Sequence, residues 1–352
     1  MESLHFEICP HVLHFKRPAG TSRGVYTTRK SWFLHLTDPA NPEKEAWGEC
    51  APLPNLSCDD IEDYERVLAD FCQDVAQKGY IDYPFWRNYP SMVFGMETAL
   101  QHWKTGSLAF WDTPFSRGEQ GIQINGLIWM GDYDYMYEQI LKKMELGFRC
   151  IKLKIGAIDF EQELDLLRFI RSRFPVGTIE LRVDANGAFK PEDALDKLNR
   201  LAEIGLHSIE QPIRAGQRGE MARLTAESRL PIAFDEELIG INDRAEKARL
   251  LDETKPAYIV LKPSLHGGME GSKEWIEEAE KRNIGWWITS ALESNVGLNA
   301  IGQWCATLNT TLPQGLGTGQ LFVDNVDIPL EVRQDALWFS APEQAKKKIV
   351  LE

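Results

Sequence analysis

The sequence predicts a parallel α/β barrel preceded by a smaller α+β domain, and three observations support this fold class. From about residue 121, short apolar, β-branched runs alternate with segments of helical periodicity. There are eight such runs, and the last residues of successive runs are 25 to 30 positions apart. This interval is the length of one strand–helix unit. The first hundred residues lack this repeat, so we expect a separate domain there.

Each of the eight runs finishes in a polar or small residue. In order they are IQIN, IKLK, IELRVD, HSIE, PIAFD, YIVLK, WWITS and QGLG, and they end at Asn125, Lys154, Asp184, Glu210, Asp235, Lys262, Ser290 and Gly317. Between them, residues 160–174 and 191–205 carry apolar side chains at helical spacing. Pro191 suits the first turn of a helix, and Gly205 suits the end of one. We therefore predict a (β/α) barrel over residues 106–318.

Residues 1–105 contain strand-like stretches at 5–18 and 31–38, followed by helical patterns at 61–79 and 91–103. Strands followed by helices, without the repeat, predict an α+β domain. The segment 319–352 is too short to form a domain, so we expect it to return and pack on the N-terminal one.

The composition limits the classes of partner and compartment. Of the 352 residues, 39 are basic and 53 acidic, for a formal charge of −14, which disfavours nucleic acid or an anionic membrane as the main partner. The six cysteines show no zinc-ligand spacing, which favours a reducing compartment. With no signal-peptide pattern and no run long enough to span a bilayer, the sequence predicts a cytoplasmic protein. It leaves the oligomeric state open, homo-oligomers included.

Five consecutive strand ends carry the residues with chemical potential: Lys154, Asp184, Glu210, Asp235 and Lys262. Active sites of parallel barrels lie at the carboxyl ends of the strands, so these side chains should meet at one rim. Three converging carboxylates repel one another unless a hard cation lies between them, and Mg²⁺ prefers such ligands. A bound cation of this kind can accept a substrate carboxylate and stabilise the charge that grows as an α-proton leaves.

The lysines suggest how that proton is removed. Lys152 and Lys154 point to the same face of one strand, and each disfavours protonation of the other, so one becomes a candidate neutral base. Lys262 approaches from the far side, as an opposing acid or base or only as a positive charge. Singly, a K-x-K pair often marks a solvated strand face, and a strand-end carboxylate often caps the next helix. The ordered set of five favours a single catalytic site instead.

Two further segments near the same rim have a functional and a structural interpretation. GLGTG at 315–319 offers backbone N–H groups to a substrate carboxylate, or forms a plain turn. SALESN at 290–295 offers hydroxyl and amide donors, or caps a helix.

Several stretches resemble the enolase superfamily, and specifically its muconate-lactonizing subgroup. They are KLKIG (152–156), VDANGAF (183–189), IEQPI (209–213), FDEEL (234–238) and VLKPS (260–264), in the order of the family, with WGECAPLPNLS (47–57) similar to the signature of its capping domain. The resemblance implies an enolase-type modified TIM barrel, (β/α)7β, with an α+β capping domain over 1–105 and a mobile lid loop near 17–24.

Within the subgroup, the stretches at 48–57, 291–304 and 315–322 are most similar to the o-succinylbenzoate synthase family. That resemblance implies a Mg²⁺-dependent hydro-lyase of menaquinone biosynthesis, with Mn²⁺ as a substitute, acting on a small-molecule carboxylate. Asp184, Glu210 and Asp235 would bind the metal. Lys154 would remove the α-proton, Lys262 would face it across the substrate ring, and Lys152 would tune Lys154. The residues expected to bind substrate are Asn186, Ser290, Ser294, Gly317, Thr318 and Arg23, with Arg17 or Arg23 meeting the succinyl carboxylate.

The reaction implied by the resemblance is β-elimination of water from 2-succinyl-6-hydroxy-2,4-cyclohexadiene-1-carboxylate, giving 2-succinylbenzoate. One departure from the family pattern is Glu236-Glu237, where Glu-Ser is more usual. The alternatives on the same scaffold are a dipeptide epimerase, an N-acylamino acid racemase and a lactonizing enzyme. A non-catalytic metal-binding barrel is a further alternative, but it gives no reason for two adjacent lysines.

Overall fold

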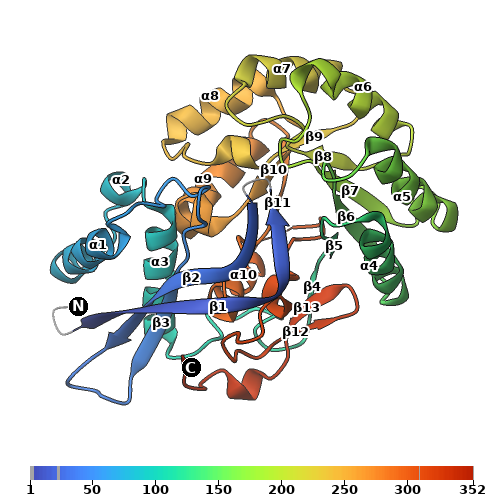
Figure 1. Ribbon diagram of the computed structural model, residues 1–352. Helices are drawn as coiled ribbons and strands as arrows, with labels where there is room; N and C mark the ends of the chain where they lie inside the picture. The colour runs from blue at the N-terminus through green and yellow to red at the C-terminus, as the bar shows by residue number, and fades with distance from the viewer. Residues whose placement is uncertain (1–3, 22–23, 309, 352) are drawn as a thin grey trace.

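The N-terminal part of the chain is an antiparallel sheet covered by helices (Figure 1). The computed structural model describes residues 4–21, 24–308 and 310–351. Strands β1 (His5–Thr21), β2 (Gly24–Thr37) and β3 (Glu45–Cys50) pair in that order, and helices α1 (Tyr64–Lys78), α2 (Tyr83–Trp86) and α3 (Pro90–Thr105) follow. This is the strand-then-helix order that the sequence predicts.

Helix α1 shows why these residues fold as they do. Val67, Leu68, Phe71 and Val75 are buried at a spacing of three and four residues, so one face of the helix packs into the core of this domain. The helix ends at Gly79, whose φ of 78° suits the left-handed conformation of a C-terminal cap.

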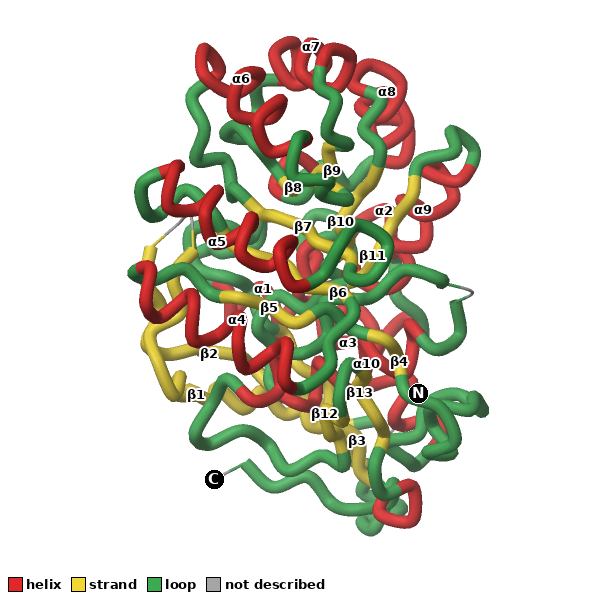
Figure 2. Tube along the Cα trace, turned by 90° about the vertical axis from the view of Figure 1, so that its right-hand side faces the viewer, coloured by secondary structure: helices red, strands yellow, loops and turns green. Residues whose placement is uncertain are grey.

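The second part is a parallel barrel with its helices outside (Figures 1 and 2). Its seven-stranded sheet has the order β11-β10-β9-β8-β7-β6-β5. The strands are β5 (Gly126–Ile128), β6 (Cys150–Lys154), β7 (Glu180–Asp184), β8 (Ser208–Glu210), β9 (Ile232–Phe234), β10 (Tyr258–Leu261) and β11 (Gly285–Ile288). The helices are α4 (Tyr133–Glu145), α5 (Phe160–Arg173), α6 (Pro191–Ala202), α7 (Arg218–Glu227), α8 (Arg244–Thr254), α9 (Gly268–Glu280) and α10 (Asn295–Cys305).

The first and last of the eight predicted runs differ from the expectation. The run at 122–125 does not form the first barrel strand. Ile122–Gln123 (β4) pairs antiparallel with residues 336–337 near the C-terminus. The first barrel strand is instead β5, just beyond Asn125, which pairs with β6. The run QGLG forms no extended strand and contributes only two parallel bridges, Ile124 to Gln314 and Thr289 to Gly315. The first bridge joins the first and last runs and the second joins the seventh run to the last, so together they complete the ring.

The C-terminal segment contacts both parts of the chain. Strands β12 (Leu330–Arg333) and β13 (Ala336–Phe339) form a hairpin that pairs with β4 next to the barrel. Phe322 bridges to Phe15, and the backbone N–H of Lys16 donates to the carbonyl of Leu321 at 2.8 Å. No helix in the described ranges is long and apolar enough to cross a lipid bilayer.

Candidate active site

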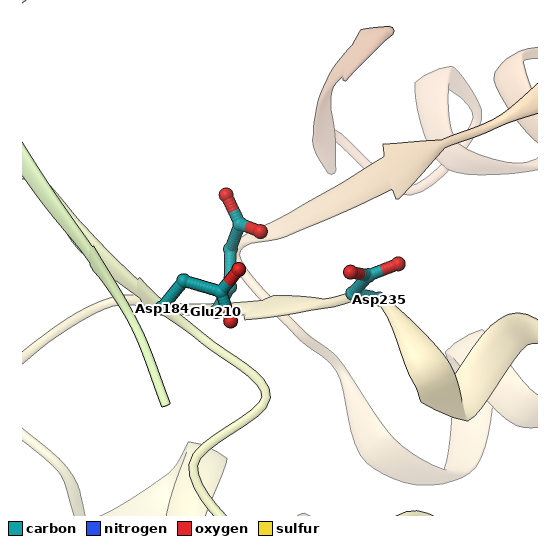
Figure 3. Close-up of side chains that lie close together, drawn as sticks. All are labelled: Asp184, Glu210 and Asp235. Atoms are coloured by element: carbon teal, nitrogen blue, oxygen red, sulfur yellow. The ribbon is translucent and has the colours of Figure 1, made fainter. Parts of the chain in front are cut away.

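Three buried carboxylates meet at the carboxyl ends of three consecutive strands (Figure 3). Asp184 ends β7, Glu210 ends β8, and Asp235 directly follows β9. Each side chain offers one oxygen, and these oxygens lie within 4.8 Å of one another. The parallel register sets Asp184 beside Glu210, so the strand pairing itself brings the two carboxylates together.

Three lysine side chains contact this acidic group from the flanking strands β6 and β10. Lys152 donates from Nζ to both oxygens of Glu210, each at 2.9 Å. Lys154 donates to Oδ2 of Asp184 at 3.0 Å. Lys262, which directly follows β10, contacts both oxygens of Asp235 at 2.7 and 2.6 Å. Because β6 and β10 lie on either side of the three acidic strands, Lys154 and Lys262 face the site from opposite directions.

Neighbouring carboxylates favour the charged form of two of the three lysines. Burial alone would lower the pKa of Lys152, but the carboxylates of Glu210 and Asp184 outweigh burial and raise it. Burial likewise opposes the charge of Lys262, and Asp235 and Glu236 raise its pKa above the usual range. At Lys152, attraction to the carboxylate of Glu210, which lies within hydrogen-bond distance, therefore outweighs repulsion from a like charge.

Asn186 links Lys154 to a fourth acidic residue. Its Oδ1 accepts a hydrogen bond from Nζ of Lys154 at 2.7 Å, and its Nδ2 donates to Oε1 of Glu236 at 3.0 Å. The backbone of Asn186 has a φ of 44°, in the left-handed region that asparagine tolerates better than most residues. Glu236 is buried beside Asp235 and Asp184, and burial followed by these two charges raises its pKa to about 7.

A cavity of about 330 Å³ opens onto these groups. It is lined by Lys152, Lys154, Asp184, Asp235, Glu236 and Lys262, and also by four of the predicted substrate-binding residues, Asn186, Ser290, Gly317 and Thr318. The hydroxyl groups of Ser290 and Thr318 lie 2.5 Å apart, which joins the ends of β11 and of the last barrel segment. The cavity is thus lined both by the charged side chains of the strand ends and by the hydroxyl groups of Ser290 and Thr318.

The predicted substrate-binding residue Ser294 is placed differently. Ser294 does not line the cavity: it is buried at the N-terminal cap of α10, where its hydroxyl donates to Oε2 of Glu49 at 2.5 Å. The cap interpretation of this serine therefore fits the structure, because Glu49 and the helix N-terminus use its polar atoms. Arg23 lies outside the described residues. The guanidinium of Arg17 lies 5.3 Å from the centre of the Tyr135 ring, and Arg17 does not line the cavity.

Sequence reasoning missed the apolar side of the cavity. Its members come from the N-terminal domain, from the segment after β5 and from the loops after β11 and the last barrel segment: Leu53, Leu56, Trp129, Ala291, Leu292 and Leu321. The stretch 47–57 carried a signal, since it resembles a family signature, but its leucines have no spacing that predicts contact with the barrel. Their place follows only from the packing of two domains.

The donor set fits a hard divalent cation. Three carboxylates converge with no histidine or cysteine among them, and all three are nearly inaccessible to solvent. Oxygen-only ligands of this kind suit Mg²⁺ or Mn²⁺ better than zinc. This buried group of acidic residues could therefore bind a metal ion.

The fold and site define the chain as a member of the enolase-like barrel enzymes. The family model described as "Enolase C-terminal domain-like" matches residues 135–341, and the model described as "MenC, N-terminal domain" matches residues 21–103. Muconate lactonizing enzyme from Pseudomonas fluorescens has the same fold, with a TM-score of 0.78 over 95% of this chain and 93% of that chain at 23% identity.

The chain belongs to the o-succinylbenzoate synthase family. It is 45% identical to an o-succinylbenzoate synthase of Desulfotalea psychrophila, over 91% of this chain and 95% of that protein. The crystal structure of MenC from the same organism has a TM-score of 0.81 and 40% identity, and covers 96% of this chain and 99% of that chain. An o-succinylbenzoate synthase of Citrobacter koseri is 26% identical over 83% of each protein.

Proposed function

We propose that this chain catalyses the Mg²⁺-dependent loss of water from 2-succinyl-6-hydroxy-2,4-cyclohexadiene-1-carboxylate, giving 2-succinylbenzoate, and so serves menaquinone biosynthesis. The observation that carries the proposal is the placement of Lys154 and Lys262 at the ends of two strands that flank three converging carboxylates. This arrangement provides a base on one side of a bound ring and a positive charge on the other.

In this proposal, Asp184, Glu210 and Asp235 hold Mg²⁺, with Mn²⁺ as a substitute. The bound cation supplies positive charge that makes the proton next to the ring carboxylate more acidic. Lys152 adds a second positive charge beside Glu210, within the same buried site. The ring and its succinyl arm lie against the apolar side of the cavity, where Leu53 and Leu292 exclude water.

The chemical step balances with the residues of this chain. Lys154, in its neutral form, takes the proton from C1 of the ring. The electrons of that C–H bond form the C1–C6 double bond, and the C6–oxygen bond breaks. The departing hydroxide takes a proton, which the newly formed Lys154 ammonium can return when both events share one face, and water is released. The ring becomes aromatic, so the second stage has a strong driving force.

Asn186 and Lys262 support this step without exchanging atoms with the substrate. Asn186 fixes the position of the Lys154 amine through its 2.7 Å hydrogen bond. Lys262 faces the developing negative charge from the opposite side, held in place by Asp235. The proposal therefore assigns proton transfer to Lys154 and charge stabilisation to Lys262.

The test is an absorbance assay with the cyclohexadiene carboxylate, purified protein and Mg²⁺, with Lys154→Ala and a chelator-treated sample alongside. We expect conversion to the aromatic product that disappears in both comparison samples and returns when Mg²⁺ is added back to the chelated protein. Lys104→Met, an exposed lysine at the end of α3, should behave like the unchanged protein.

A folded, Mg²⁺-binding protein that does not convert this compound would refute the proposal. In that case, incubation of N-acylated amino acids and dipeptides in deuterated water would show whether the two opposed lysines exchange an α-proton instead. Exchange from both enantiomers, lost in Lys154→Ala and in Lys262→Ala, would assign the chain to the racemase or epimerase alternative.

A further inference from the structure

Arg29 is a buried cation of the N-terminal domain that reaches the barrel. It lies on β2, with only 1% of its surface exposed. Its guanidinium donates to the carbonyl oxygens of Ala51, at 2.6 Å, and of Pro52, both in the N-terminal domain. It also donates to the carbonyl of Leu292, at 3.1 Å, and more weakly to that of Ala291, at 3.4 Å, both beyond the end of β11. One side chain thus joins two segments that are about 240 residues apart in sequence.

The two segments that Arg29 joins form part of the cavity wall. Leu53 directly follows Pro52, and Leu53, Ala291 and Leu292 all line the cavity. The same three side chains belong to one apolar cluster with Leu265. We call Leu53, Ala291 and Leu292 the apolar wall. Arg29 binds the backbone carbonyls of Ala291 and Leu292 and that of Pro52, which precedes Leu53. It therefore fixes the backbone that carries the apolar wall.

The backbone of the apolar wall is held in an unusual conformation. Leu292 has a φ of 63°, in the left-handed region that a branched side chain adopts only when its surroundings require it. Besides Arg29, the carboxylate of Glu293 holds this turn, since its Oε2 accepts from the N–H of Ala291 at 2.7 Å. The turn is therefore held by Arg29 of the N-terminal domain and by Glu293 from within the barrel.

A guanidinium is needed for the contact from the N-terminal domain. It presents several N–H donors in a rigid plane, and here they reach four carbonyls on two segments. A lysine at this place would keep the positive charge near Glu49 and Glu293 but could not span both segments with one nitrogen. This difference separates the effect of charge from the effect of shape.

We propose that Arg29 is a positioning residue that fixes the apolar wall against the barrel and so sets how tightly the non-reacting part of the substrate binds. The assay used to test it rests on the proposed function. The hydrogen bonds of the Arg29 guanidinium go to backbone carbonyls and not to the three carboxylates or the three lysines of the site, so Arg29 acts on the fit of the substrate and not on the proton transfer.

The experiment compares Arg29→Met and Arg29→Lys with Arg87→Met. Arg87 is a matched control because its guanidinium also joins the N-terminal domain to the barrel, at 2.7 Å from Oδ2 of Asp243, away from the cavity. We expect Arg29→Met to raise KM by about tenfold or more with a smaller fall in kcat, because misplaced binding groups weaken substrate binding first. Arg29→Lys should recover part of the loss, and Arg87→Met should keep the original KM.

Two further measurements separate positioning from loss of folding. The dissociation constant of 2-succinylbenzoate, measured by calorimetry, should rise in parallel with KM, while the affinity for Mg²⁺ stays unchanged. In a double-mutant cycle with Leu53→Ala and Arg29→Met, each KM is converted to a binding free energy. The change in the double variant should be smaller than the sum of the two single changes, because both substitutions act on the same wall.

If neither Arg29 variant folds, Glu293→Gln tests the same wall from the barrel side, since it weakens the contact to Ala291, and KM should again rise. Unchanged KM and product affinity in folded Arg29 variants, or in folded Glu293→Gln, would overturn the inference. Additive effects in the cycle would also overturn it. An inactive unchanged protein would instead refute the proposed function, while product affinity would still report on the wall.

Discussion

Nζ of Lys154 and Oδ1 of Asn186 lie 2.7 Å apart. The proposed base therefore has an uncharged neighbour, the amide of Asn186, besides the carboxylate of Asp184. Because Asn186 also donates to Glu236, its amide is held from both ends. The orientation of Lys154 thus depends on a residue in a loop with left-handed backbone, two positions beyond Asp184.

Replacement of Asn186 by glycine should lower kcat by about tenfold to a hundredfold with little loss of stability. Glycine accepts the φ of 44°, so the change removes the hydrogen bonds of the side chain to Lys154 and Glu236 without straining the backbone. Steady-state kinetics and thermal unfolding measure the two effects. Asn283→Gly is the matched control, because Asn283 is also left-handed, with a φ of 55°, but is exposed away from the cavity. Equal kcat values in the two variants would contradict the positioning of Lys154 by Asn186.

The two lysines that face each other should differ in their response to arginine. Lys262→Arg keeps a positive charge beside Asp235, so we expect it to retain roughly a tenth of the activity, well above Lys262→Met. Lys154→Arg should be as inactive as Lys154→Met, because a guanidinium does not give up its proton to become a base. The absorbance assay measures all four variants. If Lys262→Arg were as inactive as Lys262→Met, Lys262 would itself transfer a proton.

Glu97 should make the stability of the protein depend on pH. This residue of α3 accepts hydrogen bonds from the N–H groups of Met269 and Glu270 at the start of α9, and burial raises its pKa from 4.5 to about 7. Between these values the folded protein keeps a proton that the unfolded chain releases. The contribution of Glu97 to the free energy of unfolding is therefore full below pH 4.5 and is lost as the pH rises through about 7. The loss is at most about 3 kcal/mol.

The measurement for Glu97 is the free energy of unfolding of the original protein and of Glu97→Gln at pH 5 and pH 8. Since Gln does not titrate, the advantage of the original protein over the variant should be larger at pH 5 than at pH 8. A difference between the two proteins that stays constant over this range would show that Glu97 titrates alike in the folded and unfolded states.

Gly48 should not tolerate a side chain. A Cβ atom at this position of β3 would overlap the carbonyl oxygen of Gly95 on α3, where the strand and helix backbones approach closely. We expect Gly48→Ala to lower the free energy of unfolding by about 1–3 kcal/mol or more. Gly219→Ala, on α7, meets no atom within 4 Å and should instead stabilise the protein by about 0.5–1 kcal/mol. Chemical denaturation distinguishes the two, and similar stability of both variants would contradict the close packing of β3 on α3.

Much of the geometry of the candidate site was predictable because strand register is regular. Lys154, Asp184, Glu210, Asp235 and Lys262 end consecutive runs at nearly constant spacing, and parallel strands place their carboxyl ends at one rim. Six of the eight runs form strands close to the expected positions. The helices at 160–174 and 191–205 also appear, although each ends one or more residues earlier than its pattern.

The amino-acid sequence by itself determined the alternation of strands and helices and the set of charged residues that meet at one end of the barrel, since both depend on local periodicity. Only the tertiary structure decided the contacts of Ser294, Arg29 and Leu53, because their neighbours come from distant parts of the chain. It also decided the electrostatic surroundings of Lys152, since the carboxylate of Glu210 on another strand helps to raise the pKa of this lysine. The periodicity within a helix or strand is visible in the sequence, whereas contacts between distant elements have no regular spacing from which they could be predicted.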